Sequence, residues 1–210
     1  MPAETPGDLL HHLPRLWAAE AARDLTDGEL LERFLGRREE TAFAILVQRH
    51  GPMVLGVCRR VLADVHSAED AFQAVFLVLA RRAAAIRKKD SLASWLHGVA
   101  RRVALRAQAQ AVAQRGRERQ VPDVSAADVI DELMWQELRA VLDEEVGALP
   151  ERYRAAVVLC HLEGKSYDQA ARELGWPKST LASRLGKAHG LLRARLVRRG
   201  ITLAAGALAA

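Results

Sequence analysis

The sequence predicts an all-α protein made of two small helical modules that a flexible linker joins. Aromatic residues make up only 5% of the 210 residues, and alanine and leucine dominate a chain with few β-branched residues. Nearly every segment repeats its apolar residues at helical spacing, and no segment alternates convincingly like a strand. The one long break in this pattern, at residues 115–127, separates two clusters of predicted helices.

The first cluster begins with two helices. Thr26 and Glu29 match a capping box directly ahead of apolar residues, so a helix is expected to start after Thr26. A second helix spans residues 39–62, where Pro52 predicts either a kink or a division of the helix into two.

Two more helices complete the first cluster. The third is expected to open at Ser67, and its apolar residues lie on several sides of the helix: Phe72, Val75, Phe76, Val78 and Leu79. Such a helix either lies at the centre of a bundle or meets a partner. The fourth opens at Ser91 and carries one apolar stripe, which consists of Leu92, Leu96, Val99 and Val103.

The second cluster contains four predicted helices, near 128–147, 150–162, 166–174 and 177–199. In its second half, Ser166 and Gln169 form a capping box, and Gly175 supplies a left-handed helix end. Pro177 then suits the first turn of the last helix. Two helices joined by so short a turn predict a helix-turn-helix, the motif that places its second helix in a DNA major groove.

Charge is distributed unevenly along the chain, although the formal net charge is only +5. Residues 101–119 contain six arginines and one acid, and residues 176–199 contain seven basic residues and no acid. Residues 128–145 contain seven acids and one arginine. One basic stretch in each module is the expected pattern of a protein that contacts a polyanion twice.

The same inspection argues against several other classes. Cys58 and Cys160 lie far apart and outside any metal-binding array, and the seven histidines are scattered, so no metal, cofactor or disulfide framework is predicted. Reduced thiols and the absence of a secretory or membrane-spanning pattern predict a cytoplasmic protein. The nearest carboxylate group, Asp128, Asp131 and Glu132, lies at an expected helix start, which argues against a catalytic centre.

Five short strings, in this order and spacing, resemble bacterial RNA polymerase sigma factors of the extracytoplasmic-function type. The strings are AEDAFQAVF at 68–76, SWLHGVA at 94–100, LPERYR at 149–154, EGKSY at 163–167 and STLASR at 179–184. The resemblance covers about residues 40–200. It implies that the first module is a region 2 bundle and the second a region 4 helix-turn-helix.

The resemblance implies that the third helix binds the clamp helices of the largest polymerase subunit. The residues implied to make this contact are Asp70, Gln73 and Phe76. For Asp70 the residues also support a local role, because an acid three positions after Ser67 caps a helix.

For the minus-ten promoter element the resemblance implies a loop and part of the fourth helix. The implied DNA-binding residues are Arg87, Lys88, Lys89, His97, Arg101 and Arg102, where cations beside a pocket suit single-stranded DNA. We expect His97 and Arg101 on the exposed face of the helix, opposite its apolar stripe. Trp95 lies beside the stripe, so core packing is favoured over base stacking.

The last helix is implied to bind the minus-thirty-five element through Lys178, Ser179, Thr180, Ser183, Arg184 and Lys187. The chain departs from the family pattern at Ala182, a position that is often basic, so the neighbouring cations are expected to carry more of the contact.

The domain boundaries follow from these assignments. We expect an N-terminal extension, a region 2-like domain, a linker, a region 4-like domain and an apolar tail, at residues 1–40, 41–114, 115–130, 131–200 and 201–210. The predicted function is a transcription initiation factor without catalysis, whose partners are core RNA polymerase and double- and single-stranded promoter DNA. An anti-sigma factor stays open as a further partner, and a helix-turn-helix regulator that works without polymerase is the alternative function.

Overall fold

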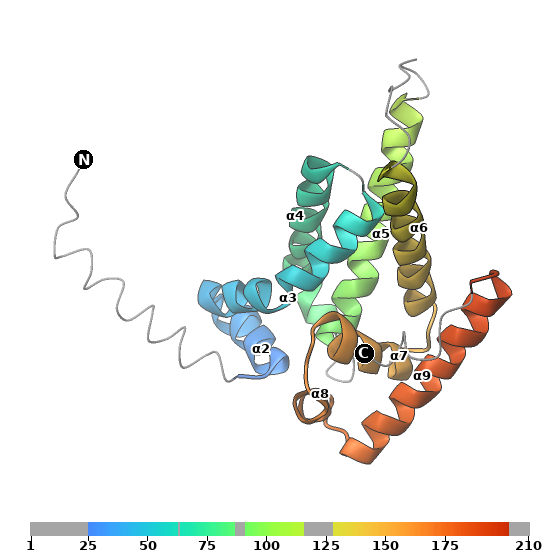
Figure 1. Cartoon of the computed structure of the whole chain (residues 1–210). Coiled ribbons are helices and arrows are strands. Elements are labelled where there is room, and N and C mark those ends of the chain that lie inside the picture. Colours follow the sequence, from blue (N-terminus) through green and yellow to red (C-terminus); the bar gives the residue numbers. More distant parts are fainter. Residues whose placement is uncertain (1–24, 63, 87–90, 116–127, 202–210) are drawn as a thin grey trace, which may run out of the picture.

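The computed structural model describes residues 25–62, 64–86, 91–115 and 128–201, and every regular element within these ranges is helical (Figure 1). The predicted all-α fold class is therefore confirmed. None of the helices in the described ranges combines the length and the apolar character needed to cross a membrane.

The first module contains the helices α2 (Asp27–Arg37), α3 (Glu40–Val61), α4 (Val65–Arg82) and α5 (Leu92–Arg115). Helix α3 lies at its centre and packs against the other three. The capping box predicted at the start of α2 is present: Glu29 N donates to the Thr26 hydroxyl at 3.3 Å, and Thr26 N donates to the Glu29 carboxylate at 2.7 Å. Pro52 neither ends nor divides α3, which runs through it as one helix.

Helix α4 begins at Val65, earlier than the sequence predicts. Its N-cap is Asp64, whose carboxylate accepts a hydrogen bond from Ser67 N at 2.7 Å. The expectation that Ser67 opens this helix is wrong, because the side chain of Asp64 already satisfies a free N–H group of the first turn. Asp70 consequently lies outside the capping position that the sequence suggested for it.

Four phenylalanines hold the first module together. Phe34 and Phe43 have ring centroids 4.8 Å apart, and Phe76 lies edge-on against both Phe43 and Phe72. The Phe76 side chain is only 5% exposed. Phe76 is therefore a core residue in this arrangement, because its ring packs on its own module, and its part in polymerase binding stays a prediction.

The second module contains α6 (Asp128–Gly147), α7 (Glu151–Val157), a π-helical turn at Val158–Leu162, α8 (Tyr167–Leu174) and α9 (Lys178–Arg198). The Ser166–Gln169 capping box and the left-handed Gly175, with φ of 63°, are both present as predicted. The four expected helices of this half are thus confirmed within one or two residues of their predicted bounds.

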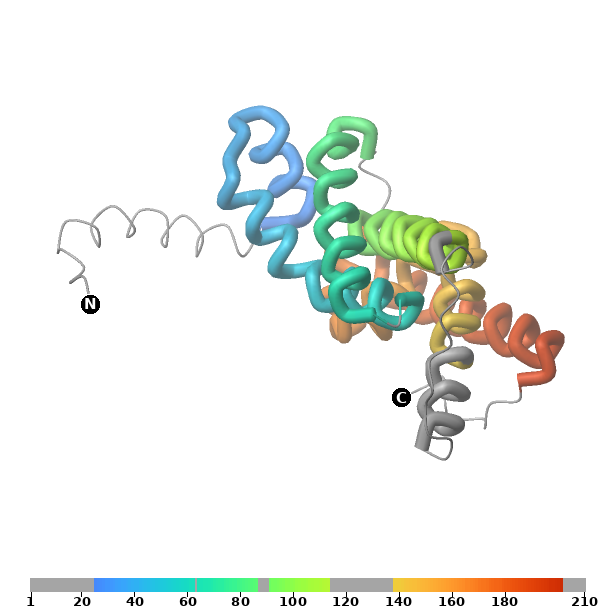
Figure 2. The backbone as a smooth tube through the Cα atoms, turned by 90° about the horizontal axis from the view of Figure 1, so that it is seen from above, coloured from blue at the N-terminus to red at the C-terminus, as the bar shows by residue number. Residues whose placement is uncertain are grey.

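The two modules pack directly against each other, an arrangement that the sequence analysis did not predict. Helices α3 and α5 of the first module contact α6, and α5 also contacts α7 and the π-helical turn. Buried apolar residues of both modules form one continuous core. Figure 2 shows the α2–α3 pair and α9 at opposite ends of the molecule, with α5 between them. The predicted linker at 115–130 falls largely on residues 116–127, which lie outside the described ranges.

Candidate nucleic-acid interface

Helices α8 and α9 form the predicted helix-turn-helix. The buried stripe of α9 consists of Leu181, Leu185, Ala188 and Leu192, each at most 2% exposed. Buried Ala170 and Ala171 of α8 let the two helices lie close together. The face of α9 opposite this stripe is free to meet a DNA groove.

The residues predicted to contact the minus-thirty-five element lie on or beside that face. Lys178, Ser179, Ser183 and Lys187 are exposed, whereas Thr180 and Arg184 are half-buried. Lys178 forms an ion pair with Asp168 of α8, but both side chains are more than half exposed, so the pair can exchange readily for a phosphate.

Arg184 has a partner that the sequence did not indicate. Its guanidinium carbon lies 4.0 Å from the centroid of the Trp176 ring, in the turn between α8 and α9. Stacking on an aromatic face leaves the N–H edge of a guanidinium available for a further contact. The turn therefore positions Arg184 beside the exposed face of α9.

The far end of α9 is tied to α6. Arg199 contacts Glu144 at 2.7 Å and Glu145 at 2.8 Å, and Arg195 reaches Glu145 at 3.4 Å. The acidic stretch of the sequence thus neutralises part of the basic stretch within the second module. The cations near the start of α9 are left to face a polyanion.

A groove of about 760 Å³ lies between α4 and α5 in the first module. Its lining includes the apolar residues Val78 and Val99, the cations Arg82, Arg102 and Arg106, and one carboxylate, that of Asp70. Trp95 lines the same groove while packing partly against the core. This combination of cations and an aromatic side chain suits a single-stranded nucleic acid, which offers both phosphates and unstacked bases.

The residues predicted for the minus-ten element are only partly brought together. Arg102 is exposed on the groove, as expected. Arg101 is half-buried and its side chain lies against Gly147, where an added Cβ would come within 3.4 Å of Arg101 Cδ. Arg87, Lys88 and Lys89 lie outside the described residues.

His97 does not lie on an exposed face, so that expectation is wrong. The side chain is 0% exposed, and its Nε2 lies 3.4 Å from the Asp143 carboxylate of α6. Arg60 of α3 binds the same carboxylate at 2.5 and 3.1 Å. Burial opposes ionisation of Asp143, but the hydrogen bonds with His97 and Arg60 keep the pKa of its carboxyl below the usual value. The second module therefore covers the face of α5 that lies opposite its apolar stripe, which the sequence analysis expected to be exposed.

The outer face of α4 remains uncovered by the second module. Gln73 is exposed and Leu77 on the same face is 58% exposed, while exposed Asp70 lies at the border between this face and the groove. The sequence analysis missed Leu77, although its spacing of four and seven residues from Gln73 and Asp70 places it on their face. An exposed leucine framed by polar side chains is typical of a protein-binding surface.

Two known protein families match most of the described chain. The family described as Sigma-70 region 2 matches residues 46–114, and the family described as Sigma-70, region 4, matches residues 139–189. Helix α2 and the first residues of α3 precede the first match.

Individual relatives match over most of their length. The RNA polymerase sigma-H factor of Pseudomonas aeruginosa is 28% identical over 178 residues, which cover 78% of this chain and 90% of that protein. The ECF RNA polymerase sigma factor SigK of Mycobacterium sp. (strain KMS) is 31% identical over 173 residues, covering 79% and 89%. Among solved structures, CnrH in complex with the cytosolic domain of CnrY matches with a TM-score of 0.40 and 20% identity, covering 82% of this chain and 97% of that one.

Proposed function

This chain belongs to the bacterial RNA polymerase sigma factors of the extracytoplasmic-function type, and from that premise we propose which of its surfaces bind promoter DNA and which binds core polymerase. The protein is a transcription initiation factor that binds core RNA polymerase and directs it to promoters. One observation carries the assignment of roles: the second module contains a complete helix-turn-helix, and the exposed polar face of its helix α9 has no acidic residue.

The exposed face of α9 is the surface for the minus-thirty-five element. Lys178, Ser183 and Lys187 are accessible at the first turns, and Arg184 is held beside them by Trp176. The N-terminal residues of a recognition helix are those that reach base edges in the major groove. Residues 131–200, the expected region 4-like domain, then act as the upstream-reading domain.

The groove between α4 and α5 is the surface for the minus-ten element. Arg82, Arg102 and Arg106 supply cations along the groove, and Trp95 supplies an aromatic side chain to its lining. Arg101 and His97 face the second module in this arrangement and are not part of the accessible groove.

The outer face of α4 is the surface for core polymerase. Asp70 and Gln73 provide polar contacts and Leu77 provides the apolar centre in place of the buried Phe76. The protein acts through these contacts alone, and the chemistry of RNA synthesis belongs to the polymerase. Asp128, Asp131 and Glu132 stand at positions in the first turns of α6, and acids at such positions favour a helix start.

Run-off transcription tests this proposal. Core RNA polymerase from the native host is combined with the full chain and a library of genomic fragments from that host. Transcripts should start at a defined subset of fragments, and only when the protein and the core enzyme are both present. Binding of fragments by the protein alone, with no effect on polymerase, would instead establish the alternative of a polymerase-independent regulator.

A further inference from the structure

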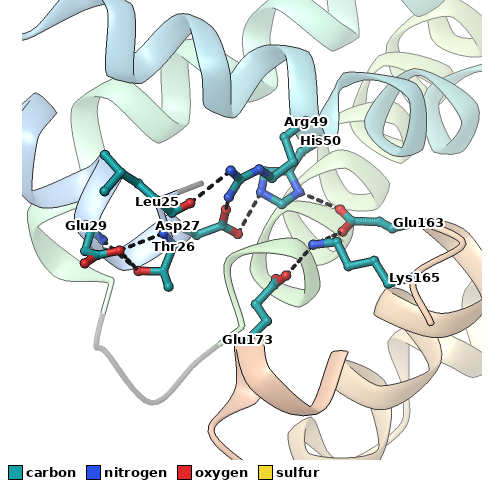
Figure 3. Close-up of polar contacts among 9 residues, drawn as sticks. All are labelled: Leu25, Thr26, Asp27, Glu29, Arg49, His50, Glu163, Lys165 and Glu173. Atoms are coloured by element: carbon teal, nitrogen blue, oxygen red, sulfur yellow. Dashed lines mark hydrogen bonds and ion pairs between the residues drawn. The ribbon is translucent and has the colours of Figure 1, made fainter. Parts of the chain in front are cut away.

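A cluster of buried charged side chains joins the two modules (Figure 3). His50 of α3 lies at its centre and is 0% exposed. Its Nε2 is 2.8 Å from an Asp27 oxygen of α2, and its Nδ1 is 2.5 Å from a Glu163 oxygen of the second module. The histidine thus bridges two carboxylates, one from each side of the interface.

This geometry requires a protonated ring. Neutral imidazole carries a single N–H group, so one of its nitrogens would present a lone pair to a carboxylate oxygen. The imidazolium form donates from both nitrogens and satisfies both carboxylates. Burial alone would lower the pKa of His50, but the hydrogen bonds to Asp27 and Glu163 raise it to about 9.

The charges around His50 lead to the same conclusion. The titratable groups that face it are Asp27 from α2, Arg49 from α3, Glu163 and Lys165 from the turn before α8, and Glu173 from α8. Three carboxylates therefore face two permanent cations, and His50 supplies the third positive charge. Loss of its proton leaves an excess negative charge between the modules, where it is poorly solvated.

Promoter geometry requires that the modules separate. The names of the minus-ten and minus-thirty-five elements place them about 25 base pairs apart, which is on the order of 85 Å along straight B-DNA at 3.4 Å per pair. A compact chain of this length has a radius of gyration of about 17 Å and is roughly 45 Å across. Twelve residues stand between Arg115 and Asp128 in the sequence, and a chain of that length spans at most ~42 Å, at ~3.5 Å per residue.

We propose that Asp27, His50 and Glu163 form a charged latch that holds the free protein in a closed arrangement, and that this latch must open before the two modules can occupy one promoter. Helix α2, which precedes the region matched by the family, contributes Asp27 and so belongs to the latch. The need for opening rests on the proposed function, whereas the latch itself does not. At neutral pH His50 stays protonated, so binding to polymerase and DNA, rather than a change of pH, supplies the energy for opening.

The closed arrangement has a measurable signature. Opening removes Glu163 from His50, which lowers the pKa of the ring toward its ordinary value. Between these two pKa values, each unit of rising pH changes the ratio of open to closed molecules by up to tenfold. The radius of gyration of the free, full chain, measured by small-angle X-ray scattering from pH 7 to pH 10, should therefore increase as the pH rises toward about 9 and level off above it.

Three variants distinguish expansion caused by opening of the latch from expansion caused by alkaline pH in general. His50→Gln cannot neutralise the cluster, so it should be expanded already at pH 7, without a step near pH 9. Glu163→Gln allows a neutral histidine to donate to Asp27 and to accept from the new amide, so this variant should stay compact with no step. His66→Gln, at an exposed position on α4, is the matched control and should behave as the unmodified chain does.

Circular dichroism establishes that each variant keeps its helix content. A step near pH 9 that persists in Glu163→Gln, or an unmodified chain whose radius is constant to pH 10, would overturn the latch even if His50→Gln failed to fold. The same variants in the transcription assay test the role of opening: His50→Gln should need less protein than the unmodified chain for half-maximal transcription. If no variant supports transcription, the proposed function fails while the scattering result stands.

Discussion

Arg184 is held by the Trp176 ring in the free protein, beside the exposed face of α9. Because its donors are placed before DNA arrives, little side-chain entropy is lost when it contacts a base. Arg184→Ala should cost about 1–3 kcal/mol at one base position and relax the preference there. Transcription from a library of upstream sequences measures this as a changed ranking of promoters.

Arg198, exposed near the end of α9, is the matched control for Arg184. A cation that meets only phosphates or solvent weakens all sequences alike when it is removed, and it reduces the salt dependence of binding. Arg198→Ala should therefore leave the ranking intact. An unchanged ranking for Arg184→Ala as well would mean that α9 provides only general electrostatic support.

Because Phe76 is buried, its substitution is expected to lower the stability of the fold. Its ring packs against Phe43 and Phe72 and is 5% exposed, so Phe76→Ala leaves a cavity in the first module. The expected loss in the free energy of unfolding is about 3–5 kcal/mol. Urea denaturation monitored by circular dichroism measures it, and a loss below about 1 kcal/mol would place Phe76 outside the core.

Among the helices, α4 presents the surface that we assign to polymerase. Leu77→Asp places a charge at the apolar centre of that surface and should weaken binding to the core enzyme more than tenfold, which is about 1.4 kcal/mol. Because Leu77 is 58% exposed, the fold should tolerate the change. Fluorescence titration of labelled protein with core polymerase gives the affinity.

The control for Leu77 is another exposed apolar residue. Val112 on α5 is 64% exposed and lies on a different helix. Val112→Asp should bind core polymerase as the unmodified chain does. Equal losses in both variants would indicate a general effect of added negative charge and would refute the assignment of the α4 face.

Local signals allowed the helices to be predicted well. The Thr26–Glu29 and Ser166–Gln169 capping boxes and Gly175 act within a few residues, so the sequence displays them directly. The face that each helix buries was harder to predict. His97 is opposite the stripe that packs inside its own module, and it is buried only because α6 covers that side. No spacing along α5 carries information about α6.

At the scale of the whole molecule, the contacts between modules were beyond sequence reasoning. His50 and Glu163 are separated by 113 positions, and neither stands in a recognisable motif with the other. A lone histidine on a helix is compatible with many environments. The latch becomes visible only when the packing brings α2, α3 and the turn before α8 together.

The free energy of unfolding of the closed molecule should also fall at acidic pH. Burial opposes ionisation of Asp27, but the hydrogen bond to His50 and the charges of His50 and Arg49 lower the pKa of its carboxyl from 3.8 to about 2. A lowered pKa contributes stability above the ordinary value, and this contribution is lost as the pH falls from about 4 through about 2. Asp27→Asn should lower the free energy of unfolding at neutral pH and flatten its decline in this acid range.

Chemical denaturation at a series of pH values measures that decline. Glu69→Gln, at an exposed position on α4, serves as the control and should retain the slope of the unmodified chain. The same slope in Asp27→Asn would show that this carboxyl does not stabilise the folded state through its charge.

The π-helical turn at Val158–Leu162 sets the register between the modules. There Glu163 N donates to the Val158 carbonyl at 3.0 Å, five residues back instead of four, so the turn is an α-helix with one inserted residue. Deleting one residue, such as the half-buried Cys160, would restore α-helical spacing and rotate everything downstream by about 100°. Glu163 would then turn away from His50, and circular dichroism with scattering should find the helices kept but the modules apart. A one-residue deletion at this turn would thus convert the closed resting form of this chain into an open one.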